Sequence, residues 1–331
     1  MEDIRTRAAA DAEHARLPRR AVSERKPNDP EAIFVVGVAR SGTTMMRALL
    51  EASGRVAMAP ENHFLGYYFG RRGARHFLRR AGNLADDDAV RRVVDLIYSG
   101  AYARHSVFRR PSYYWRWLVQ EVPRQELERR LLAAERTERG LFRAFLRLWA
   151  DVQGKPVMGE KTPTHLGHVD TLLDWFPSAR VIHMLRDPRG VYVSDRYRRQ
   201  VKDRSGYRWL AKVPPALAAW LLIITVFAWP RAVRRHHVLE RRHPDHYMLV
   251  RFEDLVTRPA ETIPRVSRFL GVELPTAPER VNVKAQKGLP RSGEGLDPMA
   301  ADRWREHIHP LVRRIIELTL RGPMRAYGYL D

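Results

Sequence analysis

The sequence of 331 residues contains no cysteine. Disulfide bonds, thiolate metal sites and cysteine nucleophiles are therefore excluded. Residues 1–30 are polar and charged and carry three prolines, so they lack the apolar segment of a signal peptide. We expect this stretch to be a flexible N-terminal tail and the protein to be cytoplasmic.

Lysine is scarce, with seven residues, and arginine supplies the rest of the 59 basic side chains. Against 38 acidic residues these give a formal net charge of +21, which suits a polyanion or an anionic membrane surface. The charge is spread along the chain without a nucleic-acid-binding motif, so nucleic acid is not the expected partner. The length is sufficient for one large α/β domain or two small ones.

Long apolar runs are also rare, and residues 213–230 form the one long stretch without charge, between Lys212 and Arg231. The segment between its prolines would form ~21 Å of helix. This is shorter than the helix of ~20 residues that is needed to cross a bilayer. We expect this helix either to be buried in the core or to lie at a membrane surface or an oligomer contact. A helix that crossed a membrane at this point would divide the α/β core.

What the sequence does contain is a strand, a glycine-bearing loop and a helix in direct succession. Residues 33–37 are apolar and β-branched, as in a buried parallel strand, and apolar residues recur at helical spacing over 45–50. The N–H groups of the loop between them and of the helix N-terminus converge on one point. This stretch therefore predicts an anion-binding site.

The spacing Gly37-x4-Gly42 is that of a P-loop, but Thr43 stands where loops that bind nucleoside triphosphates carry lysine. The cation has moved into the loop as Arg40. Such a loop is poorly equipped for γ-phosphoryl transfer. It is better suited to a ligand whose phosphate needs neutralisation without a Mg²⁺-bridged triphosphate.

Charged residues stand at the ends of two further short strands. Glu61 follows the strand 55–60, and Lys161 ends a strand that begins at Pro156. Because ligands bind outside the carboxyl ends of parallel strands, both side chains are expected near the phosphate loop. A carboxylate there does not assist anion binding, which favours a general base; a cap of the next helix is the alternative.

The strand 181–185 leads directly into Arg186. Asp187 followed by Pro188 predicts a helix start, and Ser194 lies two turns along that helix. Arg186 and Ser194 can together clamp one phosphate group, the alternative being a surface arginine and an ordinary helix serine.

The rest of the chain predicts helices around this sheet. Residues 65–150 read as a helical, acceptor-side insertion whose aromatic residues either form a core or contact a sugar or lipid. Residues 284–298 are rich in glycine and proline, as in a flexible lid, and a last helix is expected over 309–321. The expected fold class is α/β, a P-loop-like three-layer fold with a central parallel β-sheet flanked by helices, over 31–331.

Taken together, these motifs resemble the sulfotransferases that use 3′-phosphoadenosine-5′-phosphosulfate (PAPS). The resemblance rests on the loop 37–44 and on the segment 186–190 with Ser194, and it is greatest to the bacterial and protein-tyrosine or carbohydrate branch, in which arginine replaces the loop lysine. It covers residues 31–310, but 65–150 does not match, so the acceptor is not implied.

The resemblance implies a role for each candidate residue. The cofactor PAPS would be held by Arg40, Ser41, Gly42, Thr43 and Thr44 at its 5′-phosphosulfate, by Arg186 and Ser194 at its 3′-phosphate, and by a late contact from Arg303. Glu61 would be the catalytic base, and Lys161 with Arg40 would stabilise the leaving phosphate. No metal is required.

The sequence therefore predicts transfer of a sulfuryl group from PAPS to a hydroxyl of a carbohydrate, a lipid-linked molecule or another small alcohol. One alternative is a P-loop kinase or NTPase with Asp187 as a metal-holding acid. Another is a non-catalytic protein that binds a polyanion or, through 213–230, a membrane surface. A homo-oligomer is compatible with the sequence.

Overall fold

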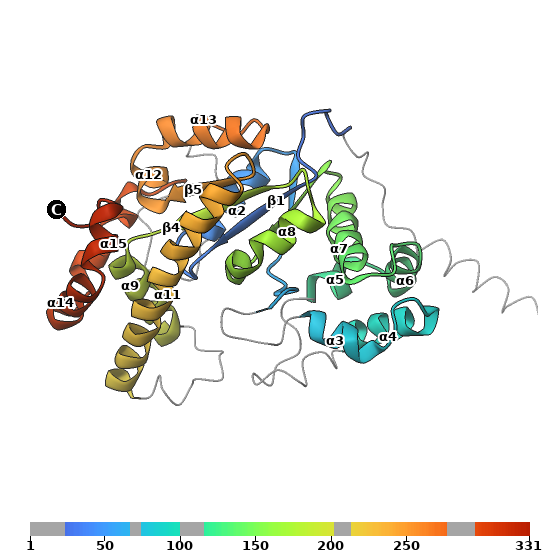
Figure 1. The fold of residues 1–331 in the computed structure, drawn as a ribbon, viewed down its shortest axis with the longest axis horizontal. Coiled ribbons are helices and arrows are strands. Elements are labelled where there is room, and N and C mark those ends of the chain that lie inside the picture. Colours follow the sequence, from blue (N-terminus) through green and yellow to red (C-terminus); the bar gives the residue numbers. More distant parts are fainter. Residues whose placement is uncertain (1–23, 67–73, 100–115, 202–212, 277–294) are drawn as a thin grey trace, which may run out of the picture. The chain divides into compact units, whose positions relative to one another are not determined.

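The computed structural model describes residues 24–66, 74–99, 116–201, 213–276 and 295–331 (Figure 1). Residues 1–23 of the expected tail therefore lie outside the described chain. Several residues of the segments 65–150 and 284–298 also lie outside it, namely the aromatic residues Tyr67, Tyr68, Phe69, Tyr113, Tyr114 and Trp115, the side chain of Trp117, and the basic residues Lys284, Lys287 and Arg291.

Five parallel strands form the central sheet, in the order β2-β3-β1-β4-β5. They are β1 (Ala32–Gly37), β2 (Val56–Ala59), β3 (Val157–Lys161), β4 (Arg180–Leu185) and β5 (Tyr247–Arg251). The first four are almost wholly buried, as expected for apolar strands covered on both faces. A parallel sheet flanked by helices confirms the predicted fold class.

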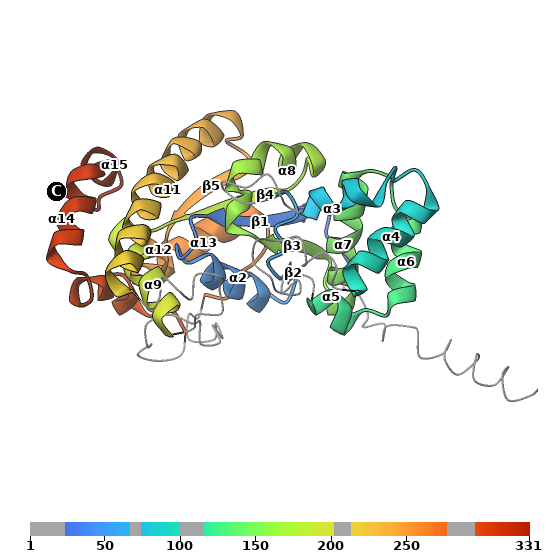
Figure 2. The same cartoon turned by 90° about the horizontal axis from the view of Figure 1, so that it is seen from below.

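The chain divides into two compact units. The larger unit comprises Asn28–Gly54 and Pro163–Asp331 and contains β1, β4 and β5. Its helices include α2 (Thr43–Ala52), α8 (Val169–Trp175), α9 (Pro188–Val201), α12 (Phe252–Thr257) and α13 (Pro259–Leu270). Within this unit, α2 lies on one face of the strands and α8 and α11 (Pro214–Arg242) on the other (Figure 2).

The smaller unit contains Arg55–Thr162 and the described residues up to Pro27. Its strands β2 and β3 pair in parallel. The predicted helical region is represented by α3 (Ala74–Ala81), α4 (Asp87–Tyr98), α5 (Arg116–Glu121), α6 (Arg124–Leu132) and α7 (Glu138–Gln153). Phe64, after β2, stacks on Phe142 of α7 with ring centroids 4.4 Å apart, so Phe64 and Phe142 belong to the core of this unit.

The helix over 213–230 is longer than the sequence analysis predicted. It continues through Pro230 to Arg242 and has 29 residues. Proline cannot donate the intrahelical hydrogen bond, but the buried residues Trp229, Val233 and Leu239 pack on both sides of Pro230 and keep the segment helical. Among the described residues, α11 is the one helix with a length and composition sufficient to cross a membrane, and 33% of its apolar window is buried.

The C-terminal part of the larger unit packs against α9 and α11. The predicted helix over 309–321 is present as α14 (Pro310–Thr319), followed by α15 (Arg321–Ala326). Short 3-10 turns lie at Pro163–His168, just before α8, and at Pro298–Ala300 and Arg303–Glu306. A shared core of large side chains joins these elements, including Tyr192, Trp229, Trp304, Ile316 and Met324.

Candidate active site

The loop between β1 and α2 has two positions that only glycine fits. Gly37 has φ +145°, and a Cβ there would lie 2.4 Å from the Met184 carbonyl oxygen of β4. Gly42 has φ +88°, and a Cβ would lie 2.5 Å from the ring of Phe252. The two glycines therefore let the loop backbone lie against its neighbours and leave the other side of the loop for a ligand.

Within this loop Arg40 adopts a left-handed backbone conformation, with φ 75°. A non-glycine residue pays a conformational cost there, and such residues concentrate at functional sites. The Ser41 hydroxyl donates to the Val38 carbonyl and so shapes the loop. Thr43 and Thr44 open α2, where the first N–H groups have no intrahelical acceptor and face an anion favourably.

The structure brings Arg40, Arg186 and Ser194 together within the larger unit. The Arg40 guanidinium donates from Nε and Nη2 to the Ser194 hydroxyl, at 3.1 and 2.9 Å. Arg186 donates from Nη1 to the backbone carbonyl of Arg40, at 3.2 Å. The Arg40 side chain thus contacts Ser194, which the resemblance assigns to the 3′-phosphate, whereas the resemblance assigns Arg40 itself to the 5′-phosphosulfate.

Arg186 is a partly buried cation whose hydrogen-bond acceptors among the described residues are neutral. Besides its bond to the Arg40 carbonyl, it donates from Nη2 to the Ala300 carbonyl at 2.9 Å, and its guanidinium lies 4.2 Å from the ring centroid of Phe252. Its Nε is buried and has no hydrogen-bond partner among the described residues. Burial lowers the pKa of Arg186, with Glu253 and Asp187 acting in the opposite direction. A bound anion would relieve the cost of burying this charge.

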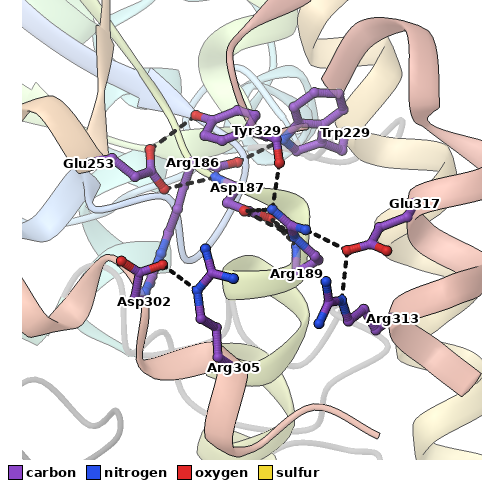
Figure 3. Close-up of polar contacts among 10 residues, drawn as sticks. All are labelled: Arg186, Asp187, Arg189, Trp229, Glu253, Asp302, Arg305, Arg313, Glu317 and Tyr329. Atoms are coloured by element: carbon purple, nitrogen blue, oxygen red, sulfur yellow. Dashed lines mark hydrogen bonds and ion pairs between the residues drawn. The ribbon is translucent and has the colours of Figure 1, made fainter. Parts of the chain in front are cut away.

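Arg189, three residues further on, is by contrast fully paired (Figure 3). It contacts both carboxylate oxygens of Asp187, the nearer at 2.6 Å, and donates to Glu317 of α14 at 2.5 Å and to the Tyr329 carbonyl at 2.7 Å. Its guanidinium also stacks 4.0 Å from the Trp304 ring centroid. Burial lowers its pKa, but Asp187 and Glu317 more than offset this, so the pKa of Arg189 is raised. This arginine has a structural role.

Glu253, which the sequence analysis did not single out, supports the turn that carries Arg186. Its carboxylate accepts from the Asp187 backbone N–H and from the Tyr329 hydroxyl, each at 3.0 Å (Figure 3). Burial raises the pKa of Glu253, partly opposed by the Asp187 N–H. The Trp229 indole also donates to the Arg186 carbonyl at 2.8 Å. The backbone around Arg186 is therefore fixed by β5–α12, α11 and the C-terminus.

Asp187 is fully engaged in these contacts. Its Oδ1 accepts from the Arg189 backbone N–H at 2.8 Å and so caps α9, as the sequence predicted. Both of its oxygens also bind the Arg189 side chain, and its side chain is 5% exposed. To hold a metal, Asp187 would have to release Arg189, so the geometry does not favour the kinase alternative.

In the smaller unit, the predicted base and cation are in contact with each other. Lys161 Nζ lies 3.2 Å from Glu61 Oε2, and His63 Nε2 lies 3.4 Å from Glu61 Oε1. The Glu61 side chain is 31% exposed, whereas that of Lys161 is 8% exposed. Among the described residues other than glycine, His63 and Arg40 alone have positive φ, so one lies at each candidate region.

His63 was not identified from the sequence, although its place two residues after Glu61 was a signal that could have found it. Asn62, between them, receives a hydrogen bond at its side chain from the Phe64 N–H and donates from its own N–H to Thr162. These contacts hold the segment after β2 in place and direct Glu61 and His63 toward one another.

Arg303 lies in the short 3-10 turn after α13 and pairs with Asp297 at 2.5 Å. Its charge contributes to lowering the pKa of Arg186, which indicates that the two cations lie in one neighbourhood. Contact of Arg303 with the cofactor stays a prediction. Of the predicted site residues, Arg40, Arg186 and Ser194 thus form one group, and Glu61 and Lys161 form another.

The chain also matches a known protein family. A family model described as the sulfotransferase family matches residues 30–276. No curated protein matches the sequence significantly.

Several solved structures resemble the chain at low identity. The sulfotransferase domain of the Synechococcus PCC 7002 olefin synthase is 21% identical, with a TM-score of 0.45, over 92% of this chain and 98% of that one. A sulfotransferase from Alicyclobacillus acidocaldarius is 17% identical, with a TM-score of 0.46, over 93% and 98%. A mouse sulfotransferase complexed with PAP is 12% identical, with a TM-score of 0.44, over 92% and 88%. Sequence identities and TM-scores this low do not identify the acceptor molecule of this chain.

Proposed function

Because this chain belongs to the sulfotransferase family, we propose that it transfers the sulfuryl group of PAPS to a hydroxyl group of an acceptor molecule. The observation that carries the proposal is Arg186, a partly buried guanidinium beside the phosphate loop. Its hydrogen-bond acceptors are backbone carbonyls, and its buried Nε has no partner among the described residues. A ligand with a second phosphate, apart from the one that the loop holds, accounts for this cation.

In this proposal the larger unit binds the cofactor. Arg186, Ser194 and Arg40 hold the 3′-phosphate of PAPS, supported by the contacts that already join them. The loop N–H groups with Thr43 and Thr44 hold the 5′-phosphosulfate, since a helix N-terminus and a glycine-bearing loop favour anions.

The smaller unit supplies the proton chemistry in this proposal. PAPS contributes an activated sulfuryl group attached to a phosphate that can leave. Glu61 takes the proton of the acceptor hydroxyl on a carboxylate oxygen, since its side chain is partly exposed and can reach a second molecule. Lys161 places positive charge at the leaving phosphate and also orients Glu61 through their hydrogen bond.

The acceptor is proposed by class only, as a carbohydrate, a lipid-linked molecule or another small alcohol. The phosphoryl-transfer alternative is disfavoured because Thr43 replaces the P-loop lysine and because Asp187 is bound to Arg189.

The test is incubation of the purified protein with sulfur-labelled PAPS and cell extract, followed by separation of sugars, lipids and small alcohols. We expect label to enter one of these classes in the presence of EDTA, and the Glu61→Gln variant to slow the transfer by ~10²-fold or more. ATP hydrolysis that needs Mg²⁺, without transfer of label, would instead support the kinase or NTPase alternative.

A further inference from the structure

Large apolar side chains are exposed on two helices of the larger unit. Val213, Ile223 and Phe227 lie at or in the first half of α11, and Leu311, Ile315 and Leu318 lie on α14. The exposed fraction reaches 56% at Ile223 and Phe227 and 64% at Leu318. In the described chain, the other large apolar residues exposed to this degree are Val119 and Met299. We call the six residues on α11 and α14 the apolar face.

The first half of α11 has no polar side. Leu217, Leu221, Thr225 and Trp229 form its buried row, and Thr225 satisfies its hydroxyl by donating to the Leu221 carbonyl. Ile223 and Phe227 lie on the opposite side of the helix, where a surface helix of a water-soluble protein carries polar residues. One side of this segment is therefore anchored in the protein while the other presents apolar groups outward.

α14 has the same division. Ile316 is buried in the core cluster that also contains Leu217 and Leu221 of α11, while Leu311 and Leu318 point outward. Both views show α14 beside α11 at one end of the unit (Figures 1 and 2). The two helices are thus fixed to one core and expose their apolar residues from it.

Basic residues border the apolar face. Arg231 is exposed at the end of the apolar segment of α11, with its guanidinium 5.7 Å from the Phe227 ring centroid. Arg314 is exposed on α14, and the sole acidic residue of that helix, Glu317, is held by Arg189 and Arg313 (Figure 3). On these two helices, the exposed charged residues nearest in sequence to the apolar residues are therefore arginines.

We propose that the apolar face docks the protein on an anionic phospholipid membrane surface, with the apolar side chains in the interface and the arginines at the phosphate headgroups. Apolar burial and basic side chains act together in such binding. A second copy of the chain fits less well, because it would bring the same arginines of a protein with net charge +21 against each other.

The helix lies on the membrane and does not cross it. The uncharged stretch ends at Arg231, and the second half of α11 carries Arg234, Arg235, Arg241 and Arg242. Moreover, its inner side is part of the core, so a crossing helix would have to leave Leu221 and Trp229 without their partners.

The test is flotation of the full chain with vesicles of phosphatidylcholine, with and without phosphatidylglycerol. We expect binding to the phosphatidylglycerol vesicles that high salt weakens, and an Ile223→Glu, Phe227→Glu variant to bind at least about tenfold more weakly. A Leu311→Glu, Leu318→Glu variant should lose binding in the same way. Val119→Glu, at an exposed apolar position in the smaller unit, should bind as the unaltered protein does.

The absence of cysteine permits a second readout, because a fluorophore can be attached at one introduced cysteine. The emission of a polarity-sensitive dye at Phe227→Cys should shift to shorter wavelength with anionic vesicles, while that at Val119→Cys should not. Absence of vesicle binding would overturn the proposal, and so would equal binding by all variants. A dimer that the Glu substitutions dissociate, without any vesicle binding, would overturn it in favour of a second copy.

Discussion

The two candidate regions differ in how their charged groups are used. Around Arg186, in the larger unit, the carboxylates of Asp187, Glu253 and Glu317 are all bound by neighbouring groups of the fold. In the smaller unit, Glu61 contacts Lys161 and His63 but keeps nearly a third of its side chain exposed. The three carboxylates named in the first region are therefore already bound, whereas the carboxylate of the second region keeps an exposed surface.

This difference suggests a division of labour. A region whose acidic groups are committed to holding arginines in place is suited to binding an anion in a fixed position. A region with a partly exposed carboxylate beside a cation is suited to moving a proton. Substitutions in the two regions should consequently change different quantities, namely stability or affinity in the first and turnover in the second.

The largest effect is expected from Arg189→Ala, which should lower the free energy of unfolding by about 3–5 kcal/mol because the buried Asp187 carboxylate would lose the guanidinium that contacts both of its oxygens. Thermal or denaturant unfolding measures it. Arg313→Ala is the matched control, since it contacts the same Glu317 oxygen from an exposed position and should change stability by less than about 1 kcal/mol. Equal effects of the two would show that Arg189 is not the centre of the network.

Next, Glu61→Gln and Lys161→Ala should each lower kcat by ~10²-fold or more, through loss of the base or of a charge-stabilising donor. Steady-state kinetics with PAPS measures this, and Glu138→Gln, an ion-paired carboxylate of the same unit, should have no such effect. Near-normal turnover in Glu61→Gln would refute the assignment of the base.

The double variant Glu61→Gln, Lys161→Ala separates two roles of the lysine. If Lys161 stabilises the leaving phosphate independently, the double variant should be much slower than either single variant. If it acts through its hydrogen bond to Glu61 alone, the double variant should be no slower than Glu61→Gln. We predict the first result.

Arg186→Ala should weaken binding of adenosine 3′,5′-bisphosphate by roughly 10- to 100-fold, as expected for loss of charge-assisted hydrogen bonds, and lower kcat less. Calorimetric titration measures the affinity. Arg305→Ala, an exposed arginine paired with Asp302 nearby, is the control and should bind normally (Figure 3). An unchanged affinity in Arg186→Ala would remove this residue from the site.

The smallest effect is expected from Gly190→Ala. A Cβ at this position would lie 2.9 Å from Arg186 Nε, so the arginine must shift, and affinity for the same ligand should fall by up to about tenfold. Gly322→Ala in α15, where a Cβ meets nothing within 4 Å, should leave the affinity unchanged. A fall of equal size in both variants would point to a general loss of stability.

Sequence reasoning predicted what depends on local pattern. The strands, the loop with Gly37 and Gly42, and the helix start at Asp187 all follow from apolar runs, glycine spacing and capping residues close together in the chain. It could not predict the partners of Arg189, because Glu317 and Tyr329 lie 128 and 140 residues away. Such pairs are fixed by tertiary packing, which no local pattern encodes.

The extent of α11 was missed for a related reason. Pro230 is a local signal for a helix end, but the burial of Trp229, Val233 and Leu239 in the fold outweighs it. The role of Phe252 could not be predicted either. Its ring contacts both Gly42 and the Arg186 guanidinium, and these three residues belong to segments that are far apart in the sequence.

The most direct test of the central claim, that separate groups of residues hold two phosphates of one adenylate, is calorimetric titration in EDTA with adenosine 3′,5′-bisphosphate and with ADP. The account predicts that the bisphosphate binds at least about tenfold more tightly, because ADP has no 3′-phosphate for Arg186 and Ser194. Equal affinities, or tight binding of ATP with Mg²⁺ and none of the bisphosphate, would contradict it.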